Sequence, residues 1–234
     1  MSADWLIPDW DAPAAVRALV TTRGCDDPMS VGAGRECTRQ GIPPLPAAPL
    51  WLRQVHGIQV LAAESYREGA EADACIARTP ALVCAVRTAD CLPLLFCADD
   101  ASVVGAAHAG WRGLSAGMIE ACVVAMAIPP ARLLAWLGPA IGPQVYEVGA
   151  DVRSAFCASD AAAERAFVPQ RQGKWLCDLY LLARLRLAAL GVQRVWGGEY
   201  CTFSDPQRFD SYRRDGAIRG HMAACIWLDP ASAL

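Results

Sequence analysis

Two of the three histidines in this chain stand in short turns that contain glycine, between apolar segments. His56 is the third residue of the sequence Q-V-H-G, and His108 begins the sequence H-A-G-W-R-G, which ends at Gly113. Small residues beside a histidine let the backbone and a ligand approach each other closely. Each histidine therefore has two interpretations, an ordinary core or surface residue and a ligand for a metal ion such as zinc.

A cysteine and an aspartate of similar interest end the sequence T-A-D-C at residues 88–91, between two apolar segments. In the first interpretation, Asp90 and its neighbours only close a tight turn through local hydrogen bonds. In the second, Cys91 is a nucleophile and His108 is its base. In the third, His56, Cys91 and His108 supply three zinc ligands and leave a fourth position open, as in catalytic zinc sites. The spacing alone does not choose among the three.

Arg112 stands just before an apolar stretch that we predict to be helical. The first amides of a helix lack partners within the helix, and the helix dipole is positive there, so this position favours an anion. A guanidinium, a possible metal ligand and a helix N-terminus therefore occur together in one segment. The alternative role of Arg112 is a salt bridge on the helix surface.

Composition excludes several classes of function. The net charge of −3 and the pI of about 5.6 leave no basic surface for DNA or RNA, and the one compact basic run, Arg213-Arg214, suits a single phosphate better than a duplex. The eleven cysteines form no C-x-x-C pair, which argues against zinc ribbons, thioredoxin-type pairs and iron–sulfur runs. No apolar stretch approaches the ~20 residues of a membrane span, and residues 1–13 do not resemble a signal peptide. We therefore expect a cytoplasmic protein with no nucleic-acid or membrane partner.

Short apolar segments predict the elements that position these residues. Strands covered on both faces are predicted at 16–22, 58–63, 82–86, 92–97, 103–107, 133–137, 192–196 and 223–228. Helices are predicted at 114–127, 150–157 and 175–190, the last stopped by Gly191. The proline-rich segment 41–49 predicts a loop. The irregular order of these elements favours an α+β fold with a mixed sheet over a regular βαβ array.

Six motifs in order make the sequence similar to a known family. They are Q-V-H-G (54–57), T-A-D-C-L-P (88–93), H-A-G-W-R-G (108–113), G-P-A-I-G-P (138–143), Y-E-V-G (146–149) and F-x-S-Y-R-R-D (209–215). From about Val20 to Leu228 the chain resembles the multicopper polyphenol oxidase or laccase-domain family, also called the peptidoglycan editing factor family. Members of this family look like purine nucleoside phosphorylases with adenosine deaminase activity.

The resemblance implies one domain over residues 1–234, with an α+β fold whose mixed sheets pack between helices in α-β-β-α layers. It also implies a metal ion, most often zinc, held by His56, Cys91 and His108. The family name implies copper, but a blue-copper site with a trinuclear cluster needs about ten histidines, and this chain has three. Oxidation by Cu²⁺ would therefore come only from incidental loading of this one site.

Two segments depart from the pattern of the family. Between Gly24 and Gly41 the usual Leu-Asn-Leu-Gly element is missing, which puts the substrate contacts expected from that loop in doubt. Near the C-terminus, His221 stands where an arginine usually follows the glycine. We interpret His221 as a residue that does not bind the metal.

The function that the resemblance implies is a zinc-dependent phosphorylase of purine nucleosides (adenosine, inosine, guanosine and methylthioadenosine) that also deaminates adenosine. For deamination, zinc lowers the pKa of water toward ~7 for attack at C6 of adenine. For phosphorolysis, an arginine holds the phosphate that attacks the ribose C1′. Arg112 is the first candidate for this arginine, and Arg23, Arg213 and Arg214 follow it.

Other residues are expected to support the substrate or the metal. Asp90 is expected to orient a metal ligand or the base, and Trp111 or Tyr146 to stack on the purine. The alternative enzyme is a cysteine amidohydrolase of peptidoglycan precursors, with Cys91 as nucleophile and His108 as base. A further alternative is a metal-binding regulator without catalysis, but a structural zinc normally has four protein ligands, and the motifs offer no fourth. We expect a monomer.

Overall fold

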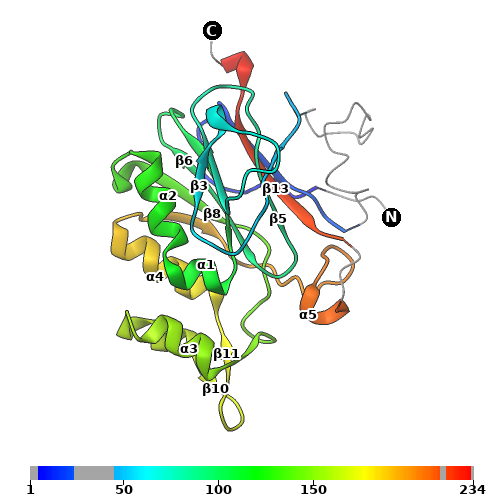
Figure 1. Ribbon diagram of the computed structural model, residues 1–234, viewed down its shortest axis with the longest axis vertical. Coiled ribbons are helices and arrows are strands. Elements are labelled where there is room, and N and C mark those ends of the chain that lie inside the picture. The colour runs from blue at the N-terminus through cyan, green and yellow to red at the C-terminus, as the bar shows by residue number, and fades with distance from the viewer. Residues whose placement is uncertain (1–4, 24–44, 217–219, 233–234) are drawn as a thin grey trace.

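The computed structural model describes residues 5–23, 45–216 and 220–232, which form two larger sheets and one small sheet (Figure 1). The four-stranded sheet has the order β1-β13-β5-β2, with β1 at Val16–Val20, β13 at Met222–Leu228, β5 at Cys84–Thr88 and β2 at Leu50–Trp51. The six-stranded sheet has the order β12-β8-β6-β7-β4-β3, with β12 at Arg194–Gly197, β8 at Leu133–Leu137, β6 at Leu92–Ala98, β7 at Val104–Ala109, β4 at Ala74–Ala77 and β3 at Val60–Ala62. Both larger sheets contain parallel and antiparallel pairs. The prediction of an α+β fold with mixed sheets is confirmed.

Strands β6, β7, β8 and β13 of the two larger sheets are buried on both faces, as their uniform apolar character predicted. Along β6, Leu94 belongs to a cluster shared with the helices, whereas Leu95 belongs to the cluster between the sheets. Along β13, Ile226 belongs to the cluster between the sheets and Trp227 to a third cluster on the outer face. Because successive side chains of a strand point to opposite faces, the two sheets share one apolar layer and each buries a second one.

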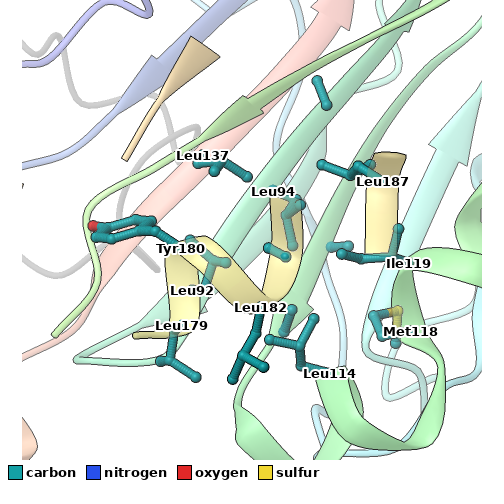
Figure 2. Packing of buried hydrophobic residues seen from close by; sticks show 14 of the residues in the cluster. Leu92, Leu94, Leu114, Met118, Ile119, Leu137, Leu179, Tyr180, Leu182 and Leu187 are labelled. Carbon is teal, nitrogen blue, oxygen red and sulfur yellow. The ribbon is translucent and has the colours of Figure 1, made fainter. Parts of the chain in front are cut away.

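Three helices cover the outer face of the six-stranded sheet, namely α1 (Trp111–Ala116), α2 (Met118–Met126) and α4 (Leu179–Leu190). Figure 2 shows their packing against β6 and β8 through Leu92, Leu94, Leu114, Ile119, Leu137, Leu182 and Leu187. Helix α4 begins where the Asp178 side chain accepts a hydrogen bond from the Leu181 amide (2.9 Å), and it ends at Gly191 with φ of 89°. No helix in the described part of the chain has the length and apolar character to cross a membrane.

A small sheet and a helix form one end of the molecule (Figure 1). The sheet has the order β10-β11-β9, with β10 at Phe167–Pro169, β11 at Lys174–Cys177 and β9 at Glu147–Gly149. Helix α3 covers Ala150–Cys157, and the short α5 covers Tyr212–Asp215 just before β13. Short 3₁₀ turns at Ala63–Ser65, Pro130–Arg132, Ala161–Ala166 and Pro230–Ser232 complete the described elements.

The predicted elements match the observed ones except in two helices. Each of the eight predicted strands overlaps an observed strand, and 133–137 and 150–157 coincide with β8 and α3. The predicted helix 114–127 was wrong as one element, because Gly117 adopts a left-handed φ of 109° that ends α1 and begins α2. The predicted helix 175–190 was wrong at its start, because 174–177 pair with β9 and β10 and the helix begins only after the Asp178 cap.

Candidate metal centre

Three of the sequence-predicted residues come together at one end of the layer between the two larger sheets. His108 is the fifth residue of β7, on the same face as Val104 and Ala106, which belong to the cluster between the sheets. Cys91 lies in the turn from β5 to β6, and His56 in the segment between β2 and β3. One ligand atom from each residue lies within 4.8 Å of the other two. The His56 Nε2 atom is 3.9 Å from Cys91 Sγ, and the two imidazole rings meet edge to face with centroids 4.7 Å apart.

The donor set and its arrangement fit a zinc ion. Two imidazole nitrogens and one thiolate are zinc ligands, and a metal with bonds of about 2.0–2.3 Å draws its ligand atoms to within about 4 Å of one another. Small movements of these side chains bring the three atoms to that separation. No fourth His, Cys, Asp or Glu joins the group within the described residues. A zinc ion held by these three described residues alone would keep one position open, which is the arrangement of a catalytic site.

Asp73, which the sequence analysis did not identify, connects two of the three candidate ligands. Its carboxylate is fully buried and accepts a hydrogen bond from His108 Nδ1 (2.8 Å). It also accepts the backbone N–H groups of Val55 (3.1 Å), His56 (2.9 Å) and Gly57 (2.7 Å). Burial alone would raise the pKa of Asp73, but the hydrogen bonds from His108 and the Val55–Gly57 backbone outweigh it and lower that pKa.

The Q-V-H-G segment is held in place at both ends. The Gln54 amide pairs with the backbone of Arg87 in β5, accepting from its N–H (2.8 Å) and donating to its carbonyl (2.9 Å). Asp73 binds the next three amides. His56 adopts a left-handed φ of 60°, which costs a residue with a Cβ about 1 kcal/mol. These contacts maintain the strained conformation that points the His56 ring toward Cys91.

The two glycines that follow His108 in H-A-G-W-R-G allow the start of α1 to lie close to the candidate ligands. A Cβ at Gly110 would lie 2.8 Å from Cys91 Sγ and 3.1 Å from His56 Cδ2. A Cβ at Gly113 would lie 2.8 Å from the carbonyl oxygen of Gly57. Real Cβ atoms do not approach other atoms so closely, so only glycine lets the first turn of α1 pack directly on the candidate centre.

The charges of Cys91 and His108 are linked. Burial raises the pKa of the Cys91 thiol, but hydrogen bonds and positive charge from His108 and His56 outweigh burial and lower it to about 7. Burial lowers the pKa of His108, but Asp73 and Cys91 outweigh it and raise that pKa to about 9. Without a metal, these two opposite shifts in pKa favour a thiolate on Cys91 beside an imidazolium on His108.

Asp90 does not contact the candidate ligands in the expected way. Its carboxylate accepts hydrogen bonds from the hydroxyls of Thr202 (2.6 Å) and Ser211 (3.0 Å) and from the backbone N–H of Arg213 (2.6 Å). Its positive φ of 86° turns the side chain toward this C-terminal segment. The expectation that Asp90 orients a metal ligand is corrected, because Asp73 is the carboxylate that binds His108.

Two of the four candidate phosphate arginines have structural partners instead. All five N–H groups of Arg214 are used, by the carbonyls of Thr202, Phe203 and Phe209 and by two contacts with Asp215. Arg23 donates to the Pro206 carbonyl and lies 3.4 Å from Asp210 and 3.8 Å from Asp215. Arg214 has no N–H group left for an anion, and Arg23 already faces two carboxylates, so the structure does not support either arginine as a phosphate ligand.

Arg112 and Arg213 are exposed, and no carboxylate of the described residues forms an ion pair with either. The Arg112 guanidinium stacks over the Trp111 ring at 4.6 Å in the first turn of α1. Arg213 stacks over the Tyr146 ring at 5.1 Å and donates one hydrogen bond to the Glu147 carbonyl (2.9 Å). Tyr146 is buried, and burial raises the pKa of its hydroxyl. Both arginines therefore keep N–H groups that can bind an anion.

The remaining predictions concern His221 and the segment 24–41. His221 lies outside the three-residue group. Burial and the charge of Arg87 lower its pKa, against the opposing charge of Asp210. The segment 24–41, where the usual family element is missing, lies outside the described residues.

Comparisons with known proteins agree with the six motifs. A family model described as multi-copper polyphenol oxidoreductase laccase matches residues 18–229. The chain is 48% identical over 242 residues to a purine nucleoside phosphorylase of Pseudomonas aeruginosa, covering 96% of this chain and 98% of that protein. It is 46% identical to the purine nucleoside phosphorylase YfiH of Escherichia coli, covering 95% and 98%. A crystal structure of a Neisseria meningitidis protein matches with a TM-score of 0.84 and 42% identity, covering 96% and 99%.

Proposed function

We propose that this chain, which belongs to the multi-copper polyphenol oxidoreductase laccase family, catalyses the phosphorolysis of purine nucleosides. One observation carries the proposal: a His–Cys–His group in which His56 is exposed, in a chain 46–48% identical over nearly its whole length to proteins named purine nucleoside phosphorylase. The substrates we propose are adenosine, inosine, guanosine and methylthioadenosine. The laccase name does not extend to a multicopper centre here, because three histidines are too few.

His56, Cys91 and His108 would hold the metal ion, which we propose to be zinc. When bound, zinc supplies a Lewis acid beside the substrate and makes water more acidic, the chemistry that deamination of adenosine at C6 requires. Cys91 needs no further activation as a ligand, because its thiol already ionises near neutral pH. His108 can present Nε2 to the metal, because Nδ1 donates its proton to Asp73. Adenosine deamination is accordingly a second activity of the same site in this proposal.

Phosphorolysis breaks the bond between the purine nitrogen and C1′ of the ribose and forms a bond between C1′ and a phosphate oxygen. The phosphate must be held on the face opposite the departing purine. Arg112 and Arg213 are suited to this, since each is exposed and neither pairs with a described carboxylate. Trp111, which is half-buried, is the aromatic ring available for contact with the purine, whereas Tyr146 is buried beneath the Arg213 guanidinium.

One observation favours a second candidate function, a cysteine amidohydrolase. The Cys91 thiol has a pKa of about 7, and a ring nitrogen of His108, the expected base, lies within 4.8 Å of its sulfur. A thiolate beside an imidazole is the arrangement of a cysteine nucleophile and its base. In this alternative the same residues act on a peptidoglycan precursor, and no metal is needed.

Metal analysis and product identification test both proposals. Purified protein should contain about one zinc per chain, release a free purine from inosine only when phosphate is present, and convert adenosine to inosine without phosphate. Cys91→Ser should lose the metal and both activities, because a neutral hydroxyl is a poor zinc ligand. Cys157→Ser, a partly exposed cysteine of α3, is the matched control and should retain both. Full metal content in Cys91→Ser with no activity would support the nucleophile instead.

A further inference from the structure

The buried carboxylate of Asp73 is shared between two elements that each carry a candidate ligand. Its Oδ1 atom accepts both His108 Nδ1 and the His56 amide, and its Oδ2 atom accepts the amides of Val55 and Gly57. The backbone carbonyl of Asp73 also accepts the His108 amide (2.7 Å). Asp73 thus fixes His108 at its ring and its backbone, and fixes His56 through the segment that carries it.

We propose that Asp73 is the positioning residue of the metal site, acting through His108 and His56 without touching the metal or the substrate. This inference rests on the proposed function, because it assigns the support of the same site. An ionised carboxylate has no proton to give, so His108 must keep its proton on Nδ1 and offer the lone pair of Nε2. The negative charge of Asp73 also makes His108 a stronger electron donor to a metal.

The variant Asp73→Asn tests whether the site depends on the hydrogen bonds that Asp73 accepts or only on the volume of its side chain. Asn has nearly the shape of Asp but only one accepting atom, because its second terminal atom is a donating NH₂ group. Whichever way the amide is oriented, that NH₂ group faces N–H donors: the His108 and His56 pair or the Val55 and Gly57 pair. Asp73→Asn therefore disturbs one ligand or the other without opening a cavity.

The test measures zinc affinity by competition with a chromophoric chelator, together with the visible spectrum of the cobalt-loaded protein. We expect Asp73→Asn to bind zinc about 10–100-fold more weakly than wild type, and its cobalt bands to shift because the ligand geometry changes. Leu187→Ala is the control for lost stability. Leu187 is fully buried in α4, within the cluster on the helical side of the six-stranded sheet, and this variant should retain wild-type zinc affinity and spectrum.

The failures of the two proposals give different results. Unchanged zinc affinity and cobalt spectrum in Asp73→Asn, with affinity lost in His108→Ala, would overturn the role of Asp73 and leave the metal site standing. Equal losses of zinc affinity in Asp73→Asn and Leu187→Ala would show that destabilisation alone weakens the site, which also overturns the role. Wild-type protein that binds no zinc would overturn the proposed site and this inference together.

Discussion

Gly110 allows a direct test of how closely the candidate centre is packed. An added Cβ would lie 2.8 Å from Cys91 Sγ and 3.1 Å from His56 Cδ2. Gly110 precedes α1 with φ of −59° and ψ of 160°, which alanine adopts without strain. The effect of Gly110→Ala is therefore a steric contact with two of the three proposed ligands.

The size of the effect follows from these distances. Non-bonded atoms rest about 3.5–4.0 Å apart, so Cys91 Sγ must retreat by about 0.7 Å or more. Metal sites hold their ligand distances to within about 0.2 Å, so the displaced sulfur no longer matches the site. We expect at least a tenfold loss of zinc affinity, about the smallest effect of disturbing the support of a ligand. Overpacking should also lower the free energy of unfolding of the metal-free protein by about 1–3 kcal/mol.

The matched control is Gly149→Ala, at the glycine that precedes α3. Gly149 has φ of −91°, and its added Cβ would meet only the carboxylate of Asp151, 2.6 Å away. Asp151 is exposed, so its side chain can rotate away. We expect wild-type zinc affinity and a change in unfolding free energy within about 0.5 kcal/mol.

The assays are chelator competition for zinc and urea unfolding of the metal-free proteins. If Gly110→Ala binds zinc as tightly as wild type and Gly149→Ala does too, the close approach of α1 does not constrain the ligands. The packing argument for the H-A-G-W-R-G glycines would then be refuted.

Three further predictions concern single residues near the centre. Arg112→Ala should raise the phosphate concentration needed for half-maximal phosphorolysis about tenfold to a hundredfold, because a charge-assisted hydrogen bond contributes about 1.5–3 kcal/mol. Adenosine deamination should fall much less, and equal loss of both activities with full metal content would contradict the phosphate role. Thr88→Val should raise the free energy of unfolding by about 1 kcal/mol in urea titrations, because the buried Thr88 hydroxyl has no hydrogen-bond partner among the described residues, and a destabilised variant would contradict this. In metal-free protein, alkylation of Cys91 should rise with pH around a midpoint near 7, since only the thiolate reacts. His108→Ala should move that midpoint up toward the ordinary value of about 8.5, and an unmoved midpoint would show that His108 does not lower the pKa.

The sequence predicted the long, uniformly apolar strands well because burial on both faces leaves a strong signal. Segment 133–137 is the clearest case, since every residue of β8 is buried. The errors arose where one glycine or one cap decided the structure. Gly117 divides a continuous apolar stretch into α1 and α2. Asp178 caps the N-terminus of α4, so that the helix begins only after β11 ends. These choices depend on tertiary contacts that periodicity does not contain.

The candidate ligands could be named from local motifs, but the roles of the arginines could not. Arg213 and Arg214 are adjacent in the sequence, so their side chains were equivalent candidates for a phosphate. In the structure, Arg214 binds three carbonyls and Asp215, whereas Arg213 stacks on Tyr146 at the surface. The difference comes from the turn of α5, which directs neighbouring side chains to different surroundings.

Asp73, the carboxylate that supports the candidate centre, was not predicted because strand β4, which follows it directly, was not predicted either. Asp90 was chosen because it precedes Cys91, yet its side chain binds the distant Ser211. Asp73 reaches His108 because β4 pairs with β7, with Ala74 opposite Ala107, so the residue before β4 lies beside His108. The four residues of β4 are Ala-Cys-Ile-Ala, and alanine is depleted in strands, so these residue types do not predict a strand. If β4 is not predicted, its pairing register with β7 is also unknown. Nothing then distinguishes Asp73 from the other acidic residues of the chain. An aspartate directly before a short apolar segment, as in A-D-A-C-I-A at residues 72–77, is the signal that could have identified both, because a carboxylate beside a buried segment needs several hydrogen-bond donors around it.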